Sequence, residues 1–543
     1  MKKLFVDFNE NIKVVSIDSL EVIYTTSSTQ DLMTYLLKGK DNKEIYIHDL
    51  SFNGAFISYD LKDRGYVSER LDSNRKKLSP KTYQKLVSEN GMIYLYKIKK
   101  NSKYGITIYD TSKLFVQDIE TIRTKVFKDN LDSHLVIPTL VKRLHEQGHT
   151  KMTVGANAFR DFLGMRFEGN WLKFKDTFPS VDMNIEKFIR HSYRGGWVYG
   201  NRDFIGKERY IRGIALDVNS LFPYVMKACI LPYGEPKYFK GEYKEDKFYP
   251  LYLQKVKIKN FCLKNNRVPM IPNRIETGYL EQGRIETLTL TNMELELLKD
   301  SYDMNEIEYI EGYKFRGCLG IFDEYIKKYG DMKIKATNEV DRMFAKLFLN
   351  NLYGKFGTKF VRQAMEFKFN EETGIEERKT LTQQYKTKQY YTAMSSFITS
   401  YARCITIKGA NDNFERFIYA DTDSLHLVGD IDDVENLKID DRELGAWKVE
   451  RNFDHIKVLG LKKYMEYDID KKEWKVVCAG LPEKAKQQIT SPEQFEYGAK
   501  FEVEVKENIV GGAKMKKSTF GIYRDILCND DYDDMDIEEL LFM

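Results

Sequence analysis

Residues 214–226, IALDVNSLFPYVM, are the stretch that decides the fold. The apolar run that ends at Asp217 predicts a buried strand with a carboxylate held at its end. The turn at 218–221 presents backbone N–H groups near a helix start, which is an anion site suited to a triphosphate. Phe222 follows where a flat ring can block a ribose 2′-hydroxyl. The alternative is a core strand, a capped helix and a packed Phe, and on its own this stretch favours that alternative.

A second motif is the segment 415–429, ERFIYADTDSLHLVG. Its alternation predicts a hairpin with a turn at 421–423. Asp is disfavoured in strands, so two Asp flanking one residue need a reason. Two-metal phosphoryl transfer needs such converging carboxylates. Asp421 and Asp423 are equally well explained as ordinary turn formers.

A third motif is KLFLNNLYGKFGT at 346–358. The periodicity predicts a helix over about 341–353. Arg342, Lys346, Asn350 and Tyr353 are spaced to share one face of it. Lys346 then joins a phosphate-seeking cation to a ring, Tyr353, that can stack on a base. The alternative is an amphipathic helix with a solvated lysine.

The N-terminal 160 residues alternate strand-like and helical runs, which predicts an α/β domain. The segment YRGGWVYGN at 193–201 predicts a turn, because Gly195 and Gly196 permit dihedrals that other residues avoid. No linker, repeat or low-complexity tract marks a domain boundary.

Composition restricts the class only broadly. The net charge is +4, but residues 525–543 hold eight acidic residues and no Lys or Arg, so the rest of the chain carries +12. A basic body is compatible with a polyanionic partner. The six cysteines form no CxxC pair, and no apolar run approaches the ~20 residues of a membrane span. We therefore expect a soluble protein of a reducing compartment, without a membrane partner. The acidic tail is expected to be solvated; the alternative is a docking peptide, because DIEELLFM ends in apolar residues beside the charges.

The order DxxSLFP, KxxxNxxYG and YxDTDS resembles the family B DNA polymerases, in particular their protein-primed branch. The likeness runs from about Leu4 to Tyr523 and includes HDLSFNGAFI, YRGG, LPYGEP, TNMELELLKDSYD, LKKYME and VCAGLPEKAK. It implies a multidomain α/β and α+β fold, with an RNase H-like exonuclease-type domain followed by a right-hand polymerase with two insertions. The implied domains are exonuclease-like 1–160, linker 161–200, palm 201–272, first insertion 273–329, fingers 330–357, second insertion 358–388, palm 389–470, thumb 471–524 and tail 525–543.

The resemblance also assigns site residues. Asp217, Asp423 and the backbone of Val218 would bind two Mg²⁺ or Mn²⁺ ions, and Asp421 would support them. Phe222 stands where the family usually has Tyr, so the hydroxyl is lost while the gating ring remains. The deoxynucleotide would contact Ser220, Leu221, Phe222, Arg342, Lys346, Asn350 and Tyr353, with Lys346 also acting on the leaving pyrophosphate. DNA would contact Tyr193, Gly195, Gly196, Lys462 and Tyr464.

The resemblance also implies which partners the two insertions contact. The first would contact a terminal protein and DNA. The second, with an expected hairpin tip at 370–374, would close a ring around DNA and give processivity and strand displacement. Expected partners are primer-template DNA, deoxynucleotides and a terminal protein primer, in a monomer or a heterodimer with that protein. The setting would be the cytoplasm of a bacterial host that carries a virus or plasmid.

The exonuclease motifs depart from the family pattern. D-x-E reads Asp7-Phe8-Asn9, N-x-x-F-D runs from Asp49 to Asn53, and Y-x-x-x-D ends at Ser133. Of four expected carboxylates only Asp7 remains, and Asn lacks the charge that binds a hard Mg²⁺ ion. The exchange of Asp49 and Asn53 leaves a compensation open, as do nearby acidic residues. We expect proofreading to be absent or severely weakened.

Two other classes compete with this interpretation. A reverse transcriptase carries adjacent aspartates in YxDD, whereas Asp421 and Asp423 are separated by one residue. A non-catalytic DNA-binding protein would have no need of the polymerase residues, which are complete apart from the change at Phe222.

Overall fold

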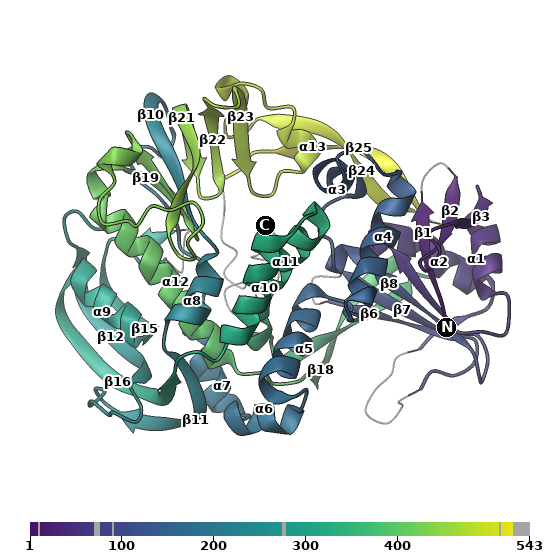
Figure 1. Ribbon diagram of the computed structural model, residues 1–543, viewed down its shortest axis with the longest axis horizontal. Helices are drawn as coiled ribbons and strands as arrows, with labels where there is room; N and C mark the ends of the chain where they lie inside the picture. Colours follow the sequence, from purple (N-terminus) through teal and green to yellow (C-terminus); the bar gives the residue numbers. More distant parts are fainter. Residues whose placement is uncertain (9–10, 70–76, 89–91, 274–277, 510–511, 525–543) are drawn as a thin grey trace.

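The computed structural model describes residues 1–8, 11–69, 77–88, 92–273, 278–509 and 512–524. The N-terminal sheet and its helices lie on one side of the molecule, two further sheets lie on the other, and helices α10 and α11 stand between them (Figure 1). The predicted acidic tail and Asn9 fall outside the described residues. Among the described helices, none combines the length and apolar character needed to span a bilayer.

The N-terminal part folds as the expected α/β domain around an eight-stranded sheet, ordered β3-β2-β1-β4-β8-β7-β6-β5. β1 (Lys2–Phe8) runs parallel to β4 (Lys43–Ile47), and β4 runs parallel to β8 (Gly105–Asp110). The other elements are β2 (Ile12–Ser16), β3 (Val22–Thr26), α1 (Thr29–Leu37), α2 (Leu50–Asp63), β5 (Val67–Ser68), β6 (Thr82–Val87), β7 (Ile93–Lys99), η1 (Thr111–Lys113), α3 (Ile119–Phe127) and α4 (Ser133–Glu146). Helices α5 (Val154–Phe167), α6 (Trp171–Thr177) and α7 (Met183–Arg190) lead out of this domain.

A seven-stranded sheet, ordered β23-β22-β21-β10-β20-β19-β9, holds the first two motifs. β10 (Lys207–Val218) lies at its centre, antiparallel to β20 (Ser424–Val428) and β21 (Trp447–Gly460). Helix α12 (Thr392–Asp412) is buried along most of its length and packs on β19 and β20. The predicted strand, turn, helix and hairpin of these two motifs are all confirmed. The remaining elements of this region are α8 (Leu221–Ala228), η2 (Phe414–Arg416), β19 (Phe417–Asp421), η3 (Ile431–Asp433) and β22 (Lys463–Asp468).

The sheets do not stop at the domain boundaries drawn from the sequence. β9 (Val198–Gly200) and β23 (Glu473–Cys478) belong to the seven-stranded sheet, although they were placed in the linker and the thumb. Likewise the four-stranded sheet β11-β16-β12-β15 reaches back from the first insertion to residue 231. Backbone pairing joins segments that sequence position alone assigns to different parts. This region contains β11 (Leu231–Lys240), β12 (Leu251–Leu263), β13 (Ile271–Pro272), β14 (Tyr279–Leu280), β15 (Gln282–Thr291), α9 (Asn292–Ser301) and β16 (Tyr302–Cys318).

The third motif lies on α11 (Glu339–Phe356), which confirms the predicted helix and extends it at both ends. The side chain of Asn338 accepts a hydrogen bond from Asp341 N, which caps the first turn. α11 packs against α5 and against α10 (Asp323–Lys335), with Tyr329 stacked on Phe348 at 5.0 Å between ring centroids. The pair α10 and α11 forms a two-helix unit.

Two long hairpins extend from this framework. The hairpin of β17 (Val361–Phe369) and β18 (Glu376–Lys386) has its tip at 370–374, as predicted. The other consists of β24 (Lys500–Ile509) and β25 (Gly512–Gly521), and it follows α13 (Glu483–Lys486) and η4 (Pro492–Gln494). Strands β24 and β25 arch from the seven-stranded sheet toward the N-terminal domain, where β25 contacts α2 (Figure 1).

Candidate active site

Three aspartates far apart in the sequence meet where β10 ends beside the β19–β20 hairpin. Asp217 pairs with Ser424 across the ladder, and Asp421 closes β19. The N–H of Val218 donates to the carbonyl of Asp423 at 2.8 Å, which fixes the hairpin turn against the end of β10. Burial raises the pKa of Asp423 to about 7, and the charges of Asp217 and Asp421 add to this shift. The backbone therefore holds the carboxylates together against their repulsion.

The turn itself is a constrained structure. Thr422 has a φ of +57°, which side-chain-bearing residues rarely adopt. Its N–H donates to Trp197 O at 2.8 Å, its carbonyl accepts from Thr406 Oγ1 at 2.6 Å, and its hydroxyl donates to Asp421 Oδ1 at 3.1 Å. These three hydrogen bonds hold Thr422 in its unfavourable backbone conformation and so fix the positions of Asp421 and Asp423.

Two lysines that no motif singled out lie against the carboxylates or beside them. Lys448 on β21 forms an ion pair with Asp217 at 3.3 Å. Lys333 on α10 donates to Ser220 Oγ at 3.1 Å. Burial raises the pKa of Asp217, and Lys448 opposes that rise. Both lysines are more than a hundred residues from their partners in the sequence, so no local sequence pattern could have revealed these contacts.

The turn after β10 brings the first and third motifs into contact. Ser220 has a φ of +56°, Leu221 is buried, and the ring of Phe222 stacks on Tyr353 with 4.2 Å between centroids. Asn219 closes the turn, since its side chain donates to Asp440 O at 2.7 Å. The expected gate ring is therefore positioned by the helix that carries Lys346.

On α11 the predicted face is graded in burial. Arg342 and Lys346 are exposed, Asn350 is half-buried and Tyr353 is buried. The charge of Lys346 acts on the pKa of Asp217, which it lowers. Burial along this face therefore increases from the two exposed cations to the ring of Tyr353.

The YRGG loop is packed between the second and third motifs. A methyl group at Gly196 would lie 2.1 Å from the hydroxyl of Thr422. One at Gly357, the C-cap of α11, would lie 2.3 Å from the ring of Tyr193, which is only 9% exposed. Arg403 on α12 donates to the carbonyls of Arg194 and Gly195 at 2.5 and 2.8 Å.

Arg403 is itself held by a buried carboxylate that the sequence did not reveal. Its guanidinium pairs with Glu294 at 2.7 Å, and Arg194 pairs with the same oxygen at 3.3 Å. Glu294 also completes the capping box of α9 with Thr291. The four-stranded sheet and its helix α9 are thereby tied to the loop beneath the aspartates.

Lys462 and Tyr464 lie beside the same hairpin. Lys462 forms an ion pair with Asp421 at 3.2 Å, and its backbone N–H donates to the hydroxyl of Tyr419 at 2.8 Å. Tyr464 is buried against Tyr419, with 4.9 Å between ring centroids, and burial raises its pKa. Within the described residues, no three His, Cys, Asp or Glu side chains are gathered closely enough to form a metal site, and two of the three aspartates are each turned toward a lysine.

The exonuclease-type positions Asp7 and Asp49 lie at the carboxyl ends of two interior strands of the N-terminal sheet, β1 and β4. Asp7 is buried near the end of β1, opposite Lys13 of β2. Asp49 precedes α2 with a φ of +57°, and Asn53, one turn later, donates its amide to His48 O at 3.0 Å. Ser133 begins α4 and donates to Glu120. Two further polar groups were missed in the sequence: the half-buried His48, which follows β4, and the buried Asp110, which ends β8.

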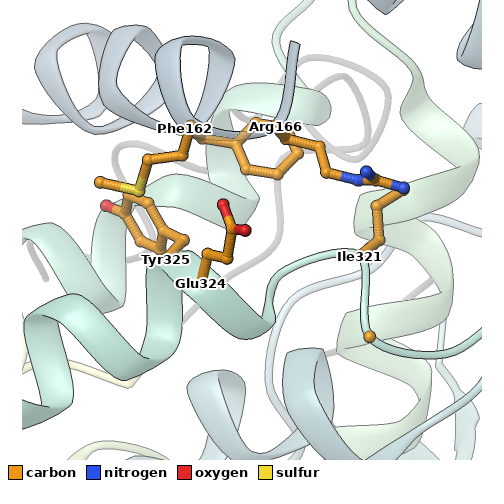
Figure 2. A pocket seen from close by; sticks show the side chains of 7 residues that line it. Phe162, Arg166, Ile321, Glu324 and Tyr325 are labelled. Atoms are coloured by element: carbon orange, nitrogen blue, oxygen red, sulfur yellow. The ribbon is translucent and has the colours of Figure 1, made fainter. Parts of the chain in front are cut away.

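The pocket in Figure 2 is a separate feature. It is a hollow of about 180 Å³ between α5 and the start of α10, lined by Phe162, Met165, Arg166, Gly320, Ile321, Glu324 and Tyr325. At a rise of about 1.5 Å per residue along α10, its last lining residue, Tyr325, is roughly 12 Å from Lys333. It contains none of the predicted site residues.

Comparison with known proteins identifies the class. The family model for DNA polymerase type B, organellar and viral, matches residues 124–440. The chain belongs to this family and is a DNA-directed DNA polymerase.

Among its relatives is the DNA polymerase of Bacillus phage phi29, with 32% identity over 91% of this chain and 93% of that protein. The DNA polymerase of Streptococcus phage Cp-1 is 28% identical over 94% of each chain. The fold matches phi29 DNA polymerase complexed with primer-template DNA at a TM-score of 0.87 and 29% identity, over 96% of this chain and all of the other. Its ternary complex with incoming nucleotide substrates matches at 0.86.

The contact between Gly196 and Thr422 gives a first prediction. Gly196→Ala will displace the turn that presents Asp421 and Asp423, because the added methyl has no room. We expect a loss of stability of about 1–3 kcal/mol and reduced primer extension, measured by thermal unfolding and a gel assay. Gly164→Ala on α5 is the matched control, since a methyl there meets nothing within 4 Å. Equal behaviour of the two variants would show that the loop does not support the turn.

Proposed function

We propose that this polymerase transfers deoxynucleotides by a two-metal mechanism at Asp217, Asp423 and the backbone carbonyl of Val218, with Asp421 in support. The observation that carries the proposal is the meeting of the three aspartates at the end of β10, where burial, with the charges of Asp217 and Asp421 adding to it, raises the pKa of Asp423 to about 7. Such a site favours a cation, and its hard oxygen donors fit Mg²⁺ or Mn²⁺. Held by these residues, two such ions would activate the attacking oxygen and stabilise the leaving one.

The protein's own groups bind and orient the substrates. Lys346 and Arg342 face the phosphates, and Lys346 stabilises the pyrophosphate as it leaves. Ser220 and Leu221 offer the turn to the triphosphate, while Phe222, braced by Tyr353, blocks a ribose 2′-hydroxyl. Further expected contacts are Asn350 with the nascent base pair, and Tyr193, Gly195, Gly196, Lys462 and Tyr464 with DNA.

Removing one carboxylate tests this function. Asp423→Asn keeps the shape of the side chain and removes its charge, so primer extension with Mg²⁺ should fall at least about a hundredfold, as for loss of one transition-state contact. The matched control is Asp432→Asn, an exposed aspartate on η3, which should extend normally. Retention of extension by Asp423→Asn would refute the assigned role.

We further propose that proofreading is absent or weak. Asp7 alone keeps the family's carboxylate, and the amide of Asn53 is engaged with a backbone carbonyl. Asp49 lies one helical turn before Asn53. Asp and Asn have exchanged places relative to the family motif, so the carboxylate of Asp49 is the specific route by which exonuclease activity could persist.

A primer with a mismatched 3′ end tests this in one reaction. With Mg²⁺ and all four deoxynucleotides, we expect extension that retains the mismatch, because the exonuclease site lacks charge to bind metal. Rapid degradation of a single-stranded primer would contradict the proposal. The Asp217→Asn variant in the same assay excludes pyrophosphorolysis as the cause of any shortening.

We also propose that the enzyme is protein-primed, processive and strand-displacing, acts inside a bacterial cell, and works with a terminal protein through the first insertion. The docking of the β17–β18 hairpin on the N-terminal domain supports the strand-displacing part. Tyr59 on α2 donates to Gly374 O at 2.8 Å and packs on Phe369. Lys85 on β6 forms an ion pair with Glu376, with exposures of only 4% and 10%. Burial lowers the pKa of Lys85 to about 8, against the attraction of Glu376.

Breaking this pair should separate displacement from synthesis. Lys85→Met leaves Glu376 buried without its partner, a loss of about 3–5 kcal/mol that should release the hairpin. We expect normal extension on an open single-stranded template but poor extension through a downstream duplex. Because it removes both charges, the double variant Lys85→Met/Glu376→Leu should recover displacement. Equal displacement by all three proteins would exclude the pair from this role.

A further inference from the structure

The feature of interest is the lysine that lies directly against the metal-binding aspartate. Lys448 is the ladder partner of Asp217 between β21 and β10. Its ammonium is 3.3 Å from Asp217 Oδ2, and the two side chains are 36% and 26% exposed. The strand register therefore fixes a cation beside this carboxylate.

The three aspartates differ in their ion pairs. Asp217 pairs with Lys448 and Asp421 pairs with Lys462 at 3.2 Å. Within the part of the chain that the structure describes, Asp423 has no ion pair with a lysine or arginine, unlike the other two aspartates. An internal monovalent cation thus occupies an oxygen that the proposed mechanism needs for a divalent one.

Lys448 also belongs to a group of like charges. Burial lowers the pKa of Lys333, and the charges of Lys346 and Lys448 lower it further. The charge of Arg342 acts on Lys333 in the same direction, so four cations interact with one another, and one of them, Lys333, donates to Ser220. If a metal ion displaces Lys448 from Asp217, the freed ammonium adds to this repulsion unless an anion arrives to receive it. A triphosphate is such an anion.

We propose that Lys448 competes with divalent metal for Asp217 in the nucleotide-free enzyme and pairs with the triphosphate once a nucleotide is bound. The inference rests on the metal-binding role proposed above for Asp217. Lys448 would be a positioning residue that couples metal affinity to nucleotide binding. When a divalent ion replaces its ammonium at Asp217, the negative charge of the triphosphate offsets the positive charge that has been added to the site. It would disfavour a fully metal-loaded site before substrate is present.

The experiment compares the full-length protein with Lys448→Met, which keeps most of the length of the side chain and removes its charge. Mn²⁺ binding is measured by electron paramagnetic resonance without DNA or nucleotide. Primer extension then gives the KM for deoxynucleotide at saturating metal. We expect Mn²⁺ to bind about three- to tenfold more tightly, and the nucleotide KM to rise roughly tenfold. Loss of folding alone would weaken both, so the opposite signs are diagnostic.

Three controls complete the design. Lys448→Arg keeps the charge and should stay near wild type in both measurements. Lys438→Met removes an exposed lysine paired with Glu443 at the surface and should change neither. Asp217→Asn should lose Mn²⁺ binding; if it does not, the proposed metal role of Asp217 itself is wrong. If Asp217→Asn behaves as expected but Lys448→Met binds Mn²⁺ no more tightly than wild type, only the competition by Lys448 is overturned.

Discussion

The rest of the structure depends on the β-ladder that joins β10 to the β19–β20 hairpin. It forces Asp217 and Asp423, two hundred residues apart, into one half-buried site, and the bond from Val218 N to Asp423 O locks the end of the strand to the turn. Carboxylates repel each other when they are brought out of water, as the raised pKa of Asp423 records. The backbone hydrogen bonds of the sheet supply the opposing free energy, so the charge arrangement is built into the fold and does not depend on side-chain packing alone.

Small residues bring the other motifs onto this site. Gly196 lets the YRGG loop lie on Thr422, and Gly357 lets the end of α11 lie on Tyr193. The stack of Phe222 on Tyr353 makes the third contact, between the turn after β10 and α11. A movement of α11 would therefore displace both the YRGG loop and the ring of Phe222, which connects this helix directly to the turns that hold the aspartates.

Most of the fold and the core of the site could be predicted from the sequence, because they rest on local patterns. The strand ending at Asp217, the hairpin around Asp421 and Asp423, and the helix of Lys346 all have a period or a turn signal. Lys333, Lys448 and the Arg403–Glu294 pair could not be found in this way, since each acts across sheet pairing or helix packing that brings distant segments together. Sheet membership could not be predicted for the same reason, and the domain boundaries stay predictions: a strand such as β23 belongs to a sheet by its hydrogen bonds, which no residue pattern marks.

The N-terminal domain separates its exonuclease-type positions from its contacts with the β17–β18 hairpin. Asn53 and Tyr59 are six residues apart on α2, so at about 100° per residue they project in directions roughly 120° apart. One direction faces the exonuclease-type positions beside His48, and the other faces the β17–β18 hairpin. A side chain can therefore change on the first face without disturbing the contact of Tyr59 on the second face or that of Lys85 on β6. Because these contacts are buried and include an ion pair, loss of the whole domain would expose them, whereas Asn53 bonds to His48 O and takes no part in them.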